Sequence, residues 1–395
     1  SAMASPAESS RRREEDRTPS PSRSSSSRPS KCRTAAERLT DDLLVEVLSR
    51  VPAKSLCRFK CVSNHWLSVI DHPDHRKKLP QTLTGFFHGS SNLEDWILES
   101  PVLFTSVSPS PPMDTSFAFL PNHQQFDLLD SCYGLLLCRL YNVSAEVGKC
   151  HYVVCNPATE KWVLLPDSGQ DSVNACLGFN PALSSHFHVF ELVEEQDNYI
   201  SGVAVYSSET GVWVYKENRW NKRVMLIELQ PSFVFLNGYL HFQVDGHDFS
   251  RYLAVVDTDG ETWMNFSVPG GLLNGFIQHS QGRLHYANFQ RDEHGGVFRL
   301  VVYVLENYQS KEWTLKHSVE TSYILGRTDY CIDGFDWIAI HPECNLIFFT
   351  IGQELKLMCY NMDRRQLKVI CNLEGVTPPY LSYVPLYAEL EALHI

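Results

Sequence analysis

Short apolar runs separated by polar turns fill the chain from residue 81 to residue 395. The turns recur as NPATE, SSETG, DTDG, NYQSK and NMDRR, and apolar segments flank each of them. Runs of four to eight residues bounded by turn residues are typical of β-strands. The pattern therefore predicts an all-β region.

Tryptophans recur through this region in one register, at 162, 213, 263 and 313, so that their spacing is 51, 50 and 50 residues. A small polar residue stands six positions before each one. These residues are Asn156, Ser207, Asp257 and Asn307. A weaker copy pairs Asn361 with Leu367, where the tryptophan is lost. The regular register indicates a repeated unit of about 50 residues, as in kelch-like proteins.

A second turn recurs between these copies, in SCYGLLLC, FLNGYLHF, SQGRLHYA and PECNLIFFT. One unit is thus two hairpins, which is the blade of a β-propeller. The span 82–395 accommodates about six such blades. The sixth is predicted to be built from 82–125 and closed by the C-terminal YVPLYAEL at 383–390. The alternative is a β-sandwich in which the tryptophan spacing arises by chance.

Residues 36–80 have helical spacing instead. The apolar residues of one helical face are Leu43, Leu44, Val47, Leu48 and Val51. Thr40 is placed to cap the start of this helix and Pro52 to end it. Two short helices are predicted to follow, one capped by Ser55 and one ending at Pro73.

Three short helices bury little apolar surface, and chains below about 40 residues are rarely stable alone. The segment nevertheless carries too many apolar side chains for a solvated tail. It is therefore predicted to dock, either on the domain that follows or on another protein.

The first 35 residues have a different composition. Eleven of the first thirty are serine, and large apolar residues are almost absent. Such a segment cannot compensate for the entropy lost on ordering, so residues 1–35 are predicted to form a disordered tail. The serines on either side of Pro21 and the nearby arginines also suit a phosphorylated or nuclear-import arm.

Charge is unevenly distributed along the chain. The formal net charge is −12, of which residues 1–38 carry +4 and the remainder −16. Because phosphate repels so acidic a body, nucleic-acid binding is not expected. With no secretory signal and no run of about eighteen apolar residues, neither export nor membrane association is expected. Twelve cysteines without a CxxC pair suggest reduced thiols, hence a cytoplasmic or nuclear location.

The helical segment resembles the F-box of plant proteins. That pattern runs Leu-Pro, an acidic pair, an apolar helix, Leu-Pro, and then Cys-Val-x-x-x-Trp. The matching residues are Leu39, Asp41, Asp42, Leu43, Leu44, Val51, Pro52, Phe59, Cys61, Val62 and Trp66. Thr40 stands where proline is usual and Val51 where leucine is common. Both departures suit the structure, since threonine caps a helix start well.

The strand region resembles the F-box-associated interaction domain of the same proteins. The similarity is carried by SCYGLLLC at 131–138, VVCNPATEKWVLLP at 153–166 and LGFNP at 177–181. It implies an α+β multidomain chain with a tail at 1–35, a three-helix F-box at 36–80 and an all-β, six-bladed propeller at 81–395.

In such proteins the F-box docks on a Skp-type adaptor, which links it to cullin and a RING subunit. The second domain captures a protein substrate for ubiquitination. The resemblance thus implies the substrate-recognition subunit of an SCF-type ubiquitin ligase, without a catalytic site or cofactor of its own. Two alternatives remain: a propeller enzyme whose helices pack on the propeller, and an adaptor-bound scaffold that does not drive degradation.

The candidate adaptor contacts are apolar or proline residues on the helices and at their ends. They are Leu39, Leu43, Leu44, Val47, Leu48, Val51, Pro52, Leu56, Phe59 and Trp66. Some must instead form the internal core of so small a unit, and the sequence does not separate the two groups.

The strand region carries no Ser-His-Asp signature, phosphate-binding glycine loop or paired-carboxylate motif. The histidines of HPDH at 72–75 and SHFH at 185–188 lack further ligands, so no metal site is expected. The repeated tryptophans could form a ligand cage, but their register favours packing between blades. Substrate-binding residues are not identified, and the substrate face is expected on loops at one end of the propeller. These loops fall within 88–95, 106–116, 142–150, 194–201, 244–251 and 290–298.

Overall fold

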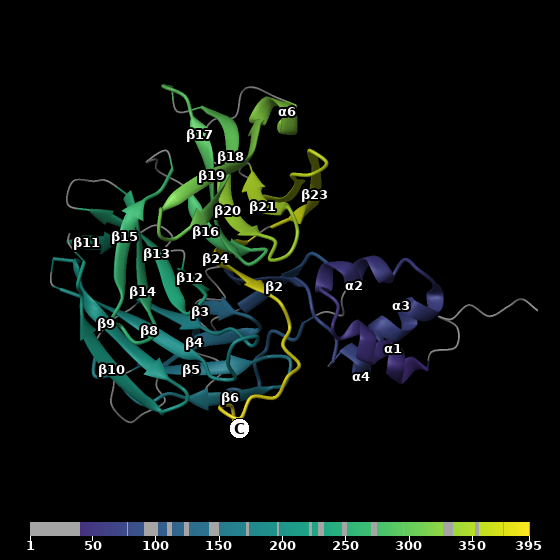
Figure 1. The fold of residues 1–395 in the computed structure, drawn as a ribbon, viewed down its shortest axis with the longest axis horizontal. Helices are drawn as coiled ribbons and strands as arrows, with labels where there is room; N and C mark the ends of the chain where they lie inside the picture. Colours follow the sequence, from purple (N-terminus) through teal and green to yellow (C-terminus); the bar gives the residue numbers. More distant parts are fainter. Residues whose placement is uncertain are drawn as a thin grey trace, which may run out of the picture. The chain divides into compact units, whose positions relative to one another are not determined.

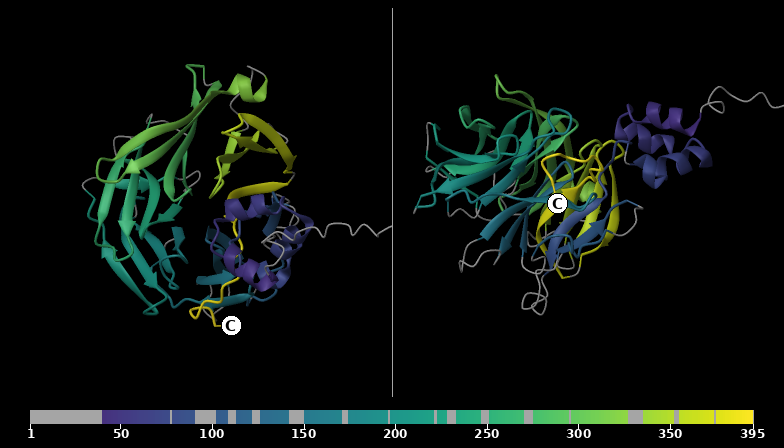
Figure 2. Two further views of the ribbon diagram at one scale, coloured as in Figure 1. Left: turned by 45° about the vertical axis from the view of Figure 1, so that its right-hand side comes forward. Right: turned by 90° about the horizontal axis from the view of Figure 1, so that it is seen from below.

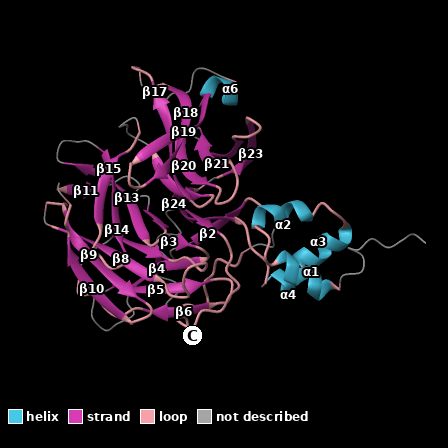
Figure 3. Ribbon diagram, in the orientation of Figure 1, coloured by secondary structure: helices cyan, strands magenta, loops and turns pink. Residues whose placement is uncertain are grey.

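The structure is a computed structural model. It describes residues 40–76, 78–90, 102–108, 113–121, 126–141, 150–170, 174–195, 197–220, 223–227, 233–246, 251–269, 275–294, 296–326, 335–351, 355–373 and 375–394. The tail at 1–35 and the candidate contact Leu39 lie outside the described residues. Figure 3 shows a few helices and a much larger number of strands.

Four short helices lie between Thr40 and Arg76 (Figure 1). They are α1 (Asp41–Leu48), α2 (Ala53–Phe59), α3 (Asn64–Asp71) and α4 (Pro73–Arg76). The predicted cap of α1 is confirmed, because the Leu43 N–H donates to Oγ1 of Thr40 at 3.4 Å. None of the helices in the described part of the chain is long and apolar enough to cross a bilayer.

Two features differ from the prediction. Helix α2 begins directly after Pro52, so Ser55 lies inside the helix rather than at its cap. Helix α3 ends just before Pro73, as predicted, but a fourth helix, α4, starts at this proline. This position suits proline, because the first residues of a helix have no intrahelical partner for their N–H groups.

Six antiparallel sheets follow, arranged as the blades of a propeller (Figure 2, left). Blade 1 contains β3 (Phe126–Cys132), β4 (Leu135–Tyr141), β5 (Cys150–Asn156) and β6 (Lys161–Leu164). Blade 2 contains β7 (Asn174–Gly178), β8 (His188–Glu194), β9 (Ile200–Ser207) and β10 (Val212–Glu217). Blade 3 contains β11 (Val224–Leu226), β12 (Phe233–Leu236), β13 (Tyr239–Gly246), β14 (Arg251–Asp257) and β15 (Trp263–Ser267).

Blade 4 contains β16 (Phe276–Ser280), β17 (Arg283–Arg291), β18 (Val297–Asn307) and β19 (Glu312–Glu320), and the short helix α6 (Thr321–Leu325) follows it. Blade 5 contains β20 (Phe335–Ile340), β21 (Leu346–Ile351), β22 (Lys356–Asn361) and β23 (Gln366–Asn372). Blade 6 contains β1 (Gly85–Ser90), β2 (Val102–Ser106) and β24 (Val376–Tyr383). The prediction of a six-bladed propeller is confirmed.

One strand of each blade lies on the inside of the ring. These inner strands contact one another in the order β3, β7, β12, β16, β20 and β24, and β24 contacts β3 again. Each sheet then runs outward by antiparallel pairing to an outer strand, namely β6, β10, β15, β19, β23 and β2.

The hydrophobic core is divided among the blade interfaces. Six clusters of buried residues occur in the described part of the chain, and each joins two neighbouring blades around the ring. In the cluster between blades 1 and 2, for example, Val154 packs with Leu177 and Val189, all at most 1% exposed. Burial of this apolar surface is what holds each blade to the next.

The polar residue six positions before each tryptophan fixes an outer hairpin turn. Oδ1 of Asn156 accepts from the Ala158 N–H at 3.0 Å, and Oδ1 of Asn307 accepts from the Gln309 N–H at 2.7 Å. Side-chain-to-backbone bonds in the same turn are made by Ser207, Asp257 and Asn361. The repeat in the sequence is therefore the repeat of one turn-forming hydrogen bond.

Blade 6 joins the two ends of the strand region. Its inner strand β24 pairs with β1, placing Tyr383 opposite Gly85. Closure of the ring by C-terminal residues agrees with the prediction, but the closing strand is 376–383 rather than 383–390. The residues after Tyr383 leave the sheet, and Leu390 and Leu393 are buried in the cluster between blades 1 and 2. The Leu386 carbonyl accepts from Nδ2 of Asn156 at 2.8 Å, which ties this segment to blade 1.

Candidate functional site

The candidate docking residues on α1 and α2 differ in their exposure to solvent. Leu44, Leu48 and Leu56 are buried, with 3%, 0% and 4% exposure. Leu43 and Val47 are 54% and 55% exposed. These two residues stand four positions apart on α1, so they lie on the same helical face. They form the exposed apolar pair of α1, to which a partner has direct access.

The remaining described candidates are half-buried or exposed. Val51, Phe59 and Trp66 are half-buried, and Pro52 is exposed. The rings of Phe59 and Trp66 meet edge to face, with centroids 5.5 Å apart, which joins α2 to α3.

Two exposed apolar residues were absent from the predicted contacts. Val62 and Leu67 are 59% and 39% exposed. Val62 lies in the turn after α2, and Leu67 lies on α3 with the buried Val69 and Ile70. Residue type alone does not show which of these apolar side chains is covered, so the pattern could not single out the exposed ones.

The histidines of the helical segment serve local backbone groups. The rings of His72 and His75 are 4.6 Å apart. A ring nitrogen of His75 lies 2.9 Å from the Val69 carbonyl, and His72 accepts from the Asp74 N–H. Within the described ranges, no group of three or more His, Cys, Asp or Glu side chains is placed to hold a metal ion.

A buried carboxyl group connects two inner strands of the propeller. Asp130 on β3 accepts from the Ser131 N–H at 2.7 Å and from the Leu177 N–H of β7 at 2.8 Å. Burial outweighs these hydrogen bonds and raises the pKa of Asp130 to about 7. Because both oxygens are bonded to backbone groups, the arrangement favours a structural link between blades 1 and 2 over proton transfer.

Two of the repeated tryptophans pack against the preceding blade. The Trp213 ring lies 6.2 Å from that of Tyr152 in blade 1, and its indole N–H donates to the Pro166 carbonyl at 2.8 Å. The Trp313 ring lies 6.5 Å from that of Phe266 in blade 3. This geometry supports the packing interpretation of the repeat.

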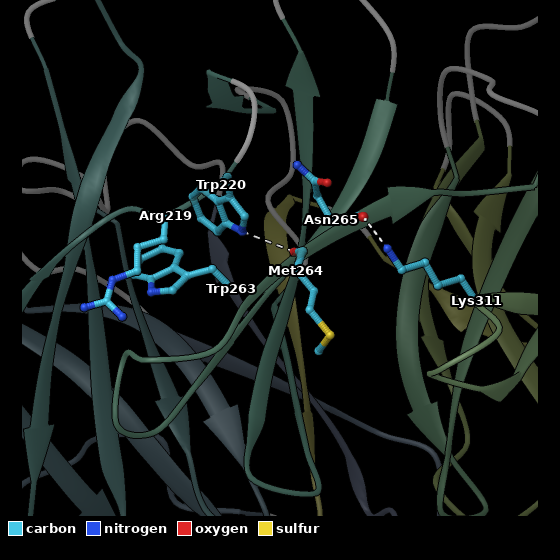
Figure 4. Close-up of a pocket in the computed structure, with 6 residues that line it drawn as sticks. All are labelled: Arg219, Trp220, Trp263, Met264, Asn265 and Lys311. Carbon is cyan, nitrogen blue, oxygen red and sulfur yellow. Dashed lines mark hydrogen bonds between the residues drawn. The ribbon is translucent and has the colours of Figure 1, made fainter.

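Trp263 also contacts the preceding blade, through Trp220, and in addition it lines a pocket beside the outer strand β15 (Figure 4). The pocket has a volume of about 120 Å³. Its lining residues are Arg219, Trp220, Trp263, Met264, Asn265 and Lys311. They come from three blades, since Arg219 and Trp220 follow β10 and Lys311 lies in the turn between β18 and β19.

The two indole rings of this β15 pocket are fixed in place. They meet edge to face, with centroids 4.6 Å apart. The Trp220 N–H donates to the Met264 carbonyl at 3.1 Å, and the Trp263 N–H donates to the Gly260 carbonyl at 2.8 Å. The sequence drew attention to Trp263 through its register, whereas Trp220 stands outside the register and was missed.

Five of the six loops predicted to form the substrate face leave the ring at one end, because each connects the second and third strands of a blade, counted from the inside. The sixth range, 106–116, starts at the end of β2. Ser106 there pairs with Gly85 at the start of β1, so this range starts at the opposite end of blade 6 and the prediction is wrong for it. Much of 88–95, 142–150 and 244–251 lies outside the described residues.

Two family models match this combination of helices and blades. The model of the F-box domain matches residues 37–78, a range that includes all four helices. The model of the "F-box protein At3g26010-like, beta-propeller" matches residues 114–377, from the segment before β3 into β24. The chain belongs to this family of plant F-box proteins.

Two F-box proteins of Arabidopsis thaliana are similar to this F-box protein over most of its length. F-box protein At5g07610 is 27% identical over 386 residues, which cover 85% of this chain and 86% of the relative. F-box protein At4g19940 is 24% identical over 397 residues, covering 90% of each. Among solved structures, TolB from Acinetobacter baumannii matches with a TM-score of 0.46 and 10% identity, covering 76% of this chain and 66% of that one. The exposed pair of α1 thus lies within the matched F-box.

Proposed function

We propose that this F-box protein is the substrate-recognition subunit of an SCF-type ubiquitin ligase. In this proposal the F-box docks on a Skp-type adaptor, through which it reaches cullin and a RING subunit. The propeller captures a protein for ubiquitination and catalyses no reaction itself. The complex would act in the cytoplasm or the nucleus.

The observation that carries the proposal is the exposure of Leu43 and Val47 on α1. Both side chains are more than half exposed in a helix whose other apolar residues, Leu44, Val45 and Leu48, are at most 3% exposed. Full burial of a leucine or valine side chain contributes about 1.5–3 kcal/mol. Covering the exposed halves of the pair at an interface would therefore contribute on the order of 2 kcal/mol.

The double substitution Leu43→Glu and Val47→Glu is expected to abolish capture of a Skp-type adaptor. A carboxylate buried in an apolar interface without a partner loses several kcal/mol of hydration. Capture is measured by co-purification of the full chain with the adaptor. Because the two side chains are exposed in the free protein, the thermal unfolding of the chain should be nearly unchanged.

Leu183→Glu is the matched control, since Leu183 in blade 2 is 68% exposed and lies outside the matched F-box. This variant is expected to keep full adaptor capture. Undiminished capture by the double variant would contradict the assignment of the adaptor-binding surface, and absence of any adaptor capture by the unchanged chain would contradict the proposed function.

The role in degradation is tested in cells by proximity labelling under proteasome inhibition. The full chain and the Leu43→Glu, Val47→Glu variant are expected to label the same propeller partners. In the absence of the inhibitor, the abundance of a true substrate should rise in cells that carry only the variant, because its capture no longer leads to ubiquitination. Captured proteins whose abundance never changes would favour the adaptor-bound scaffold.

A further inference from the structure

We propose that the β15 pocket binds a carboxylate side chain, Glu or Asp, of a captured peptide. This inference rests on the proposed function, because it names a chemical feature of the substrate. The carboxylate would accept from the Lys311 ammonium and from the Asn265 side-chain amide, beside the two fixed indoles.

Lys311 supplies a positive charge that no described carboxylate neutralises. Its ammonium lies 3.3 Å from the Asn265 carbonyl and 5.7 Å from the centre of the Phe266 ring, and it makes no ion pair within the described ranges. A backbone carbonyl and a ring face satisfy only part of its three-donor capacity. The ammonium is therefore available for an anionic partner.

Asn265 supplies a second donor. Its amide nitrogen is buried and has no hydrogen-bond partner among the described residues. Asn265 and Trp263 stand two positions apart on β15, so their side chains share one face of the strand. Figure 4 shows the Asn265 side chain between the Trp220 indole and the Lys311 ammonium. A guest that accepts from this amide would remove the unsatisfied group.

The donor set matches a single negative charge better than two. The other cation of the pocket, Arg219, is already paired with Glu261 at 2.8 Å. Glu261 also pairs with Lys216, and these contacts lower its pKa, so its carboxylate stays charged. One free ammonium and one amide complement a carboxylate, whereas a phosphate dianion needs several charged donors.

The net charge of −12 on the whole chain opposes an acidic ligand only at long range. At physiological ionic strength charges more than about 8 Å apart are largely screened. The local pair of Lys311 and Asn265 then decides binding, and the acidic surroundings would disfavour non-specific contacts by acidic proteins elsewhere on the surface.

The test measures binding of short peptides to the full chain labelled with 5-fluorotryptophan. The probes are acetylated and amidated Gly-Ser-Gly-X-Gly-Ser-Gly peptides in which X is Glu, Gln or phosphoserine. The ¹⁹F signals of Trp220 and Trp263, assigned with the two Trp→Phe variants, report occupancy. The Glu peptide is expected to shift both signals saturably, and more weakly as salt is added, whereas the Gln peptide should bind at least about tenfold more weakly.

Variants assign the effect to the pocket. Lys311→Gln should weaken binding of the Glu peptide about tenfold, and Lys311→Arg should retain most of it. Lys368→Gln is the matched control, because Lys368 is an exposed lysine on another outer strand, β23. Adaptor capture by each variant is measured in parallel and should not change.

Equal binding of the Glu and Gln peptides, tighter binding of the phosphoserine peptide, or no effect of Lys311→Gln would each overturn the carboxylate site. Any of these results with adaptor capture intact would leave the proposed ligase function standing. Saturable Glu binding by a chain that captures no adaptor would instead separate the pocket from that function.

Discussion

The turn residue Asn156 is predicted to contribute more to stability than its counterparts in the other blades. It is 0% exposed, and its side chain makes two hydrogen bonds: Oδ1 accepts from Ala158 and Nδ2 donates to the Leu386 carbonyl. Asn307 in blade 4 has the same place in the repeat but is exposed, and its bond to the Gln309 N–H is local to the turn.

Asn156→Ala removes both bonds in a buried setting. A net hydrogen bond contributes about 1 kcal/mol, and a buried group left without a partner costs about 1–3 kcal/mol. The loss is therefore expected to be about 2–4 kcal/mol. Asn307→Ala removes one bond at the surface, where water replaces the lost acceptor, and should cost about 0.5–1 kcal/mol.

The comparison is made by urea unfolding of both variants, followed by tryptophan fluorescence. Amide hydrogen exchange of residues 384–394 provides a second measurement, because loss of the bond to Leu386 should release this segment in Asn156→Ala but not in Asn307→Ala. Asn156→Asp separates the two hydrogen bonds. It keeps the acceptor for the Ala158 N–H but places a carboxylate oxygen against the Leu386 carbonyl. Equal losses in the two alanine variants, with unchanged exchange at 384–394, would refute the reasoning.

Two further predictions concern the blade interfaces. Asp130 has a pKa of about 7 in the folded chain against about 4 in the unfolded chain. Between these pH values the folded state binds one more proton than the unfolded state. The free energy of unfolding therefore falls as the pH rises through this range. Asp130→Asn should flatten that slope in urea unfolding measured at about pH 5 and about pH 8, and a slope identical to that of the unchanged chain would contradict the assignment. Trp213→Ala should lower the free energy of unfolding by about 3 kcal/mol, the low end for truncation of a large aromatic residue, because the ring is only half-buried. A melting temperature equal to that of the unchanged chain would show that Trp213 does not hold blades 1 and 2 together.

The blade architecture could be predicted because each unit repeats a local signal. The residue six positions before each tryptophan makes its bond within the turn, so the spacing of Asn156, Ser207 and Asp257 in the sequence reflects local geometry. The closing strand had no such signal. Pro378 and Pro379 interrupt the apolar pattern of β24, and proline is rare within sheets, so the apolar segment after Tyr383 resembled a strand more closely than the true one did.

The candidate sites were predictable only in part. The apolar residues of α1 could be identified by their helical spacing, but the exposure of Leu43 and the burial of Leu44 depend on what covers each side of the helix. The β15 pocket could not be anticipated, because Trp220, Asn265 and Lys311 are brought together by packing of three blades. No periodicity in the sequence connects these positions.

The composition of blade 6 has a consequence for synthesis of the chain on the ribosome. Strands β1 and β2 emerge first among the described strands, whereas their partner β24 is translated about 270 residues later. At roughly 5–20 residues per second, this interval lasts on the order of 15–50 s. Blades 1 to 5 consist of continuous sequence and can form in order as they emerge, but the open edge of β1 stays unpaired throughout. An unpaired strand edge attracts other chains, so the nascent protein is most vulnerable to misassociation, and most dependent on chaperones, until its last strand is made.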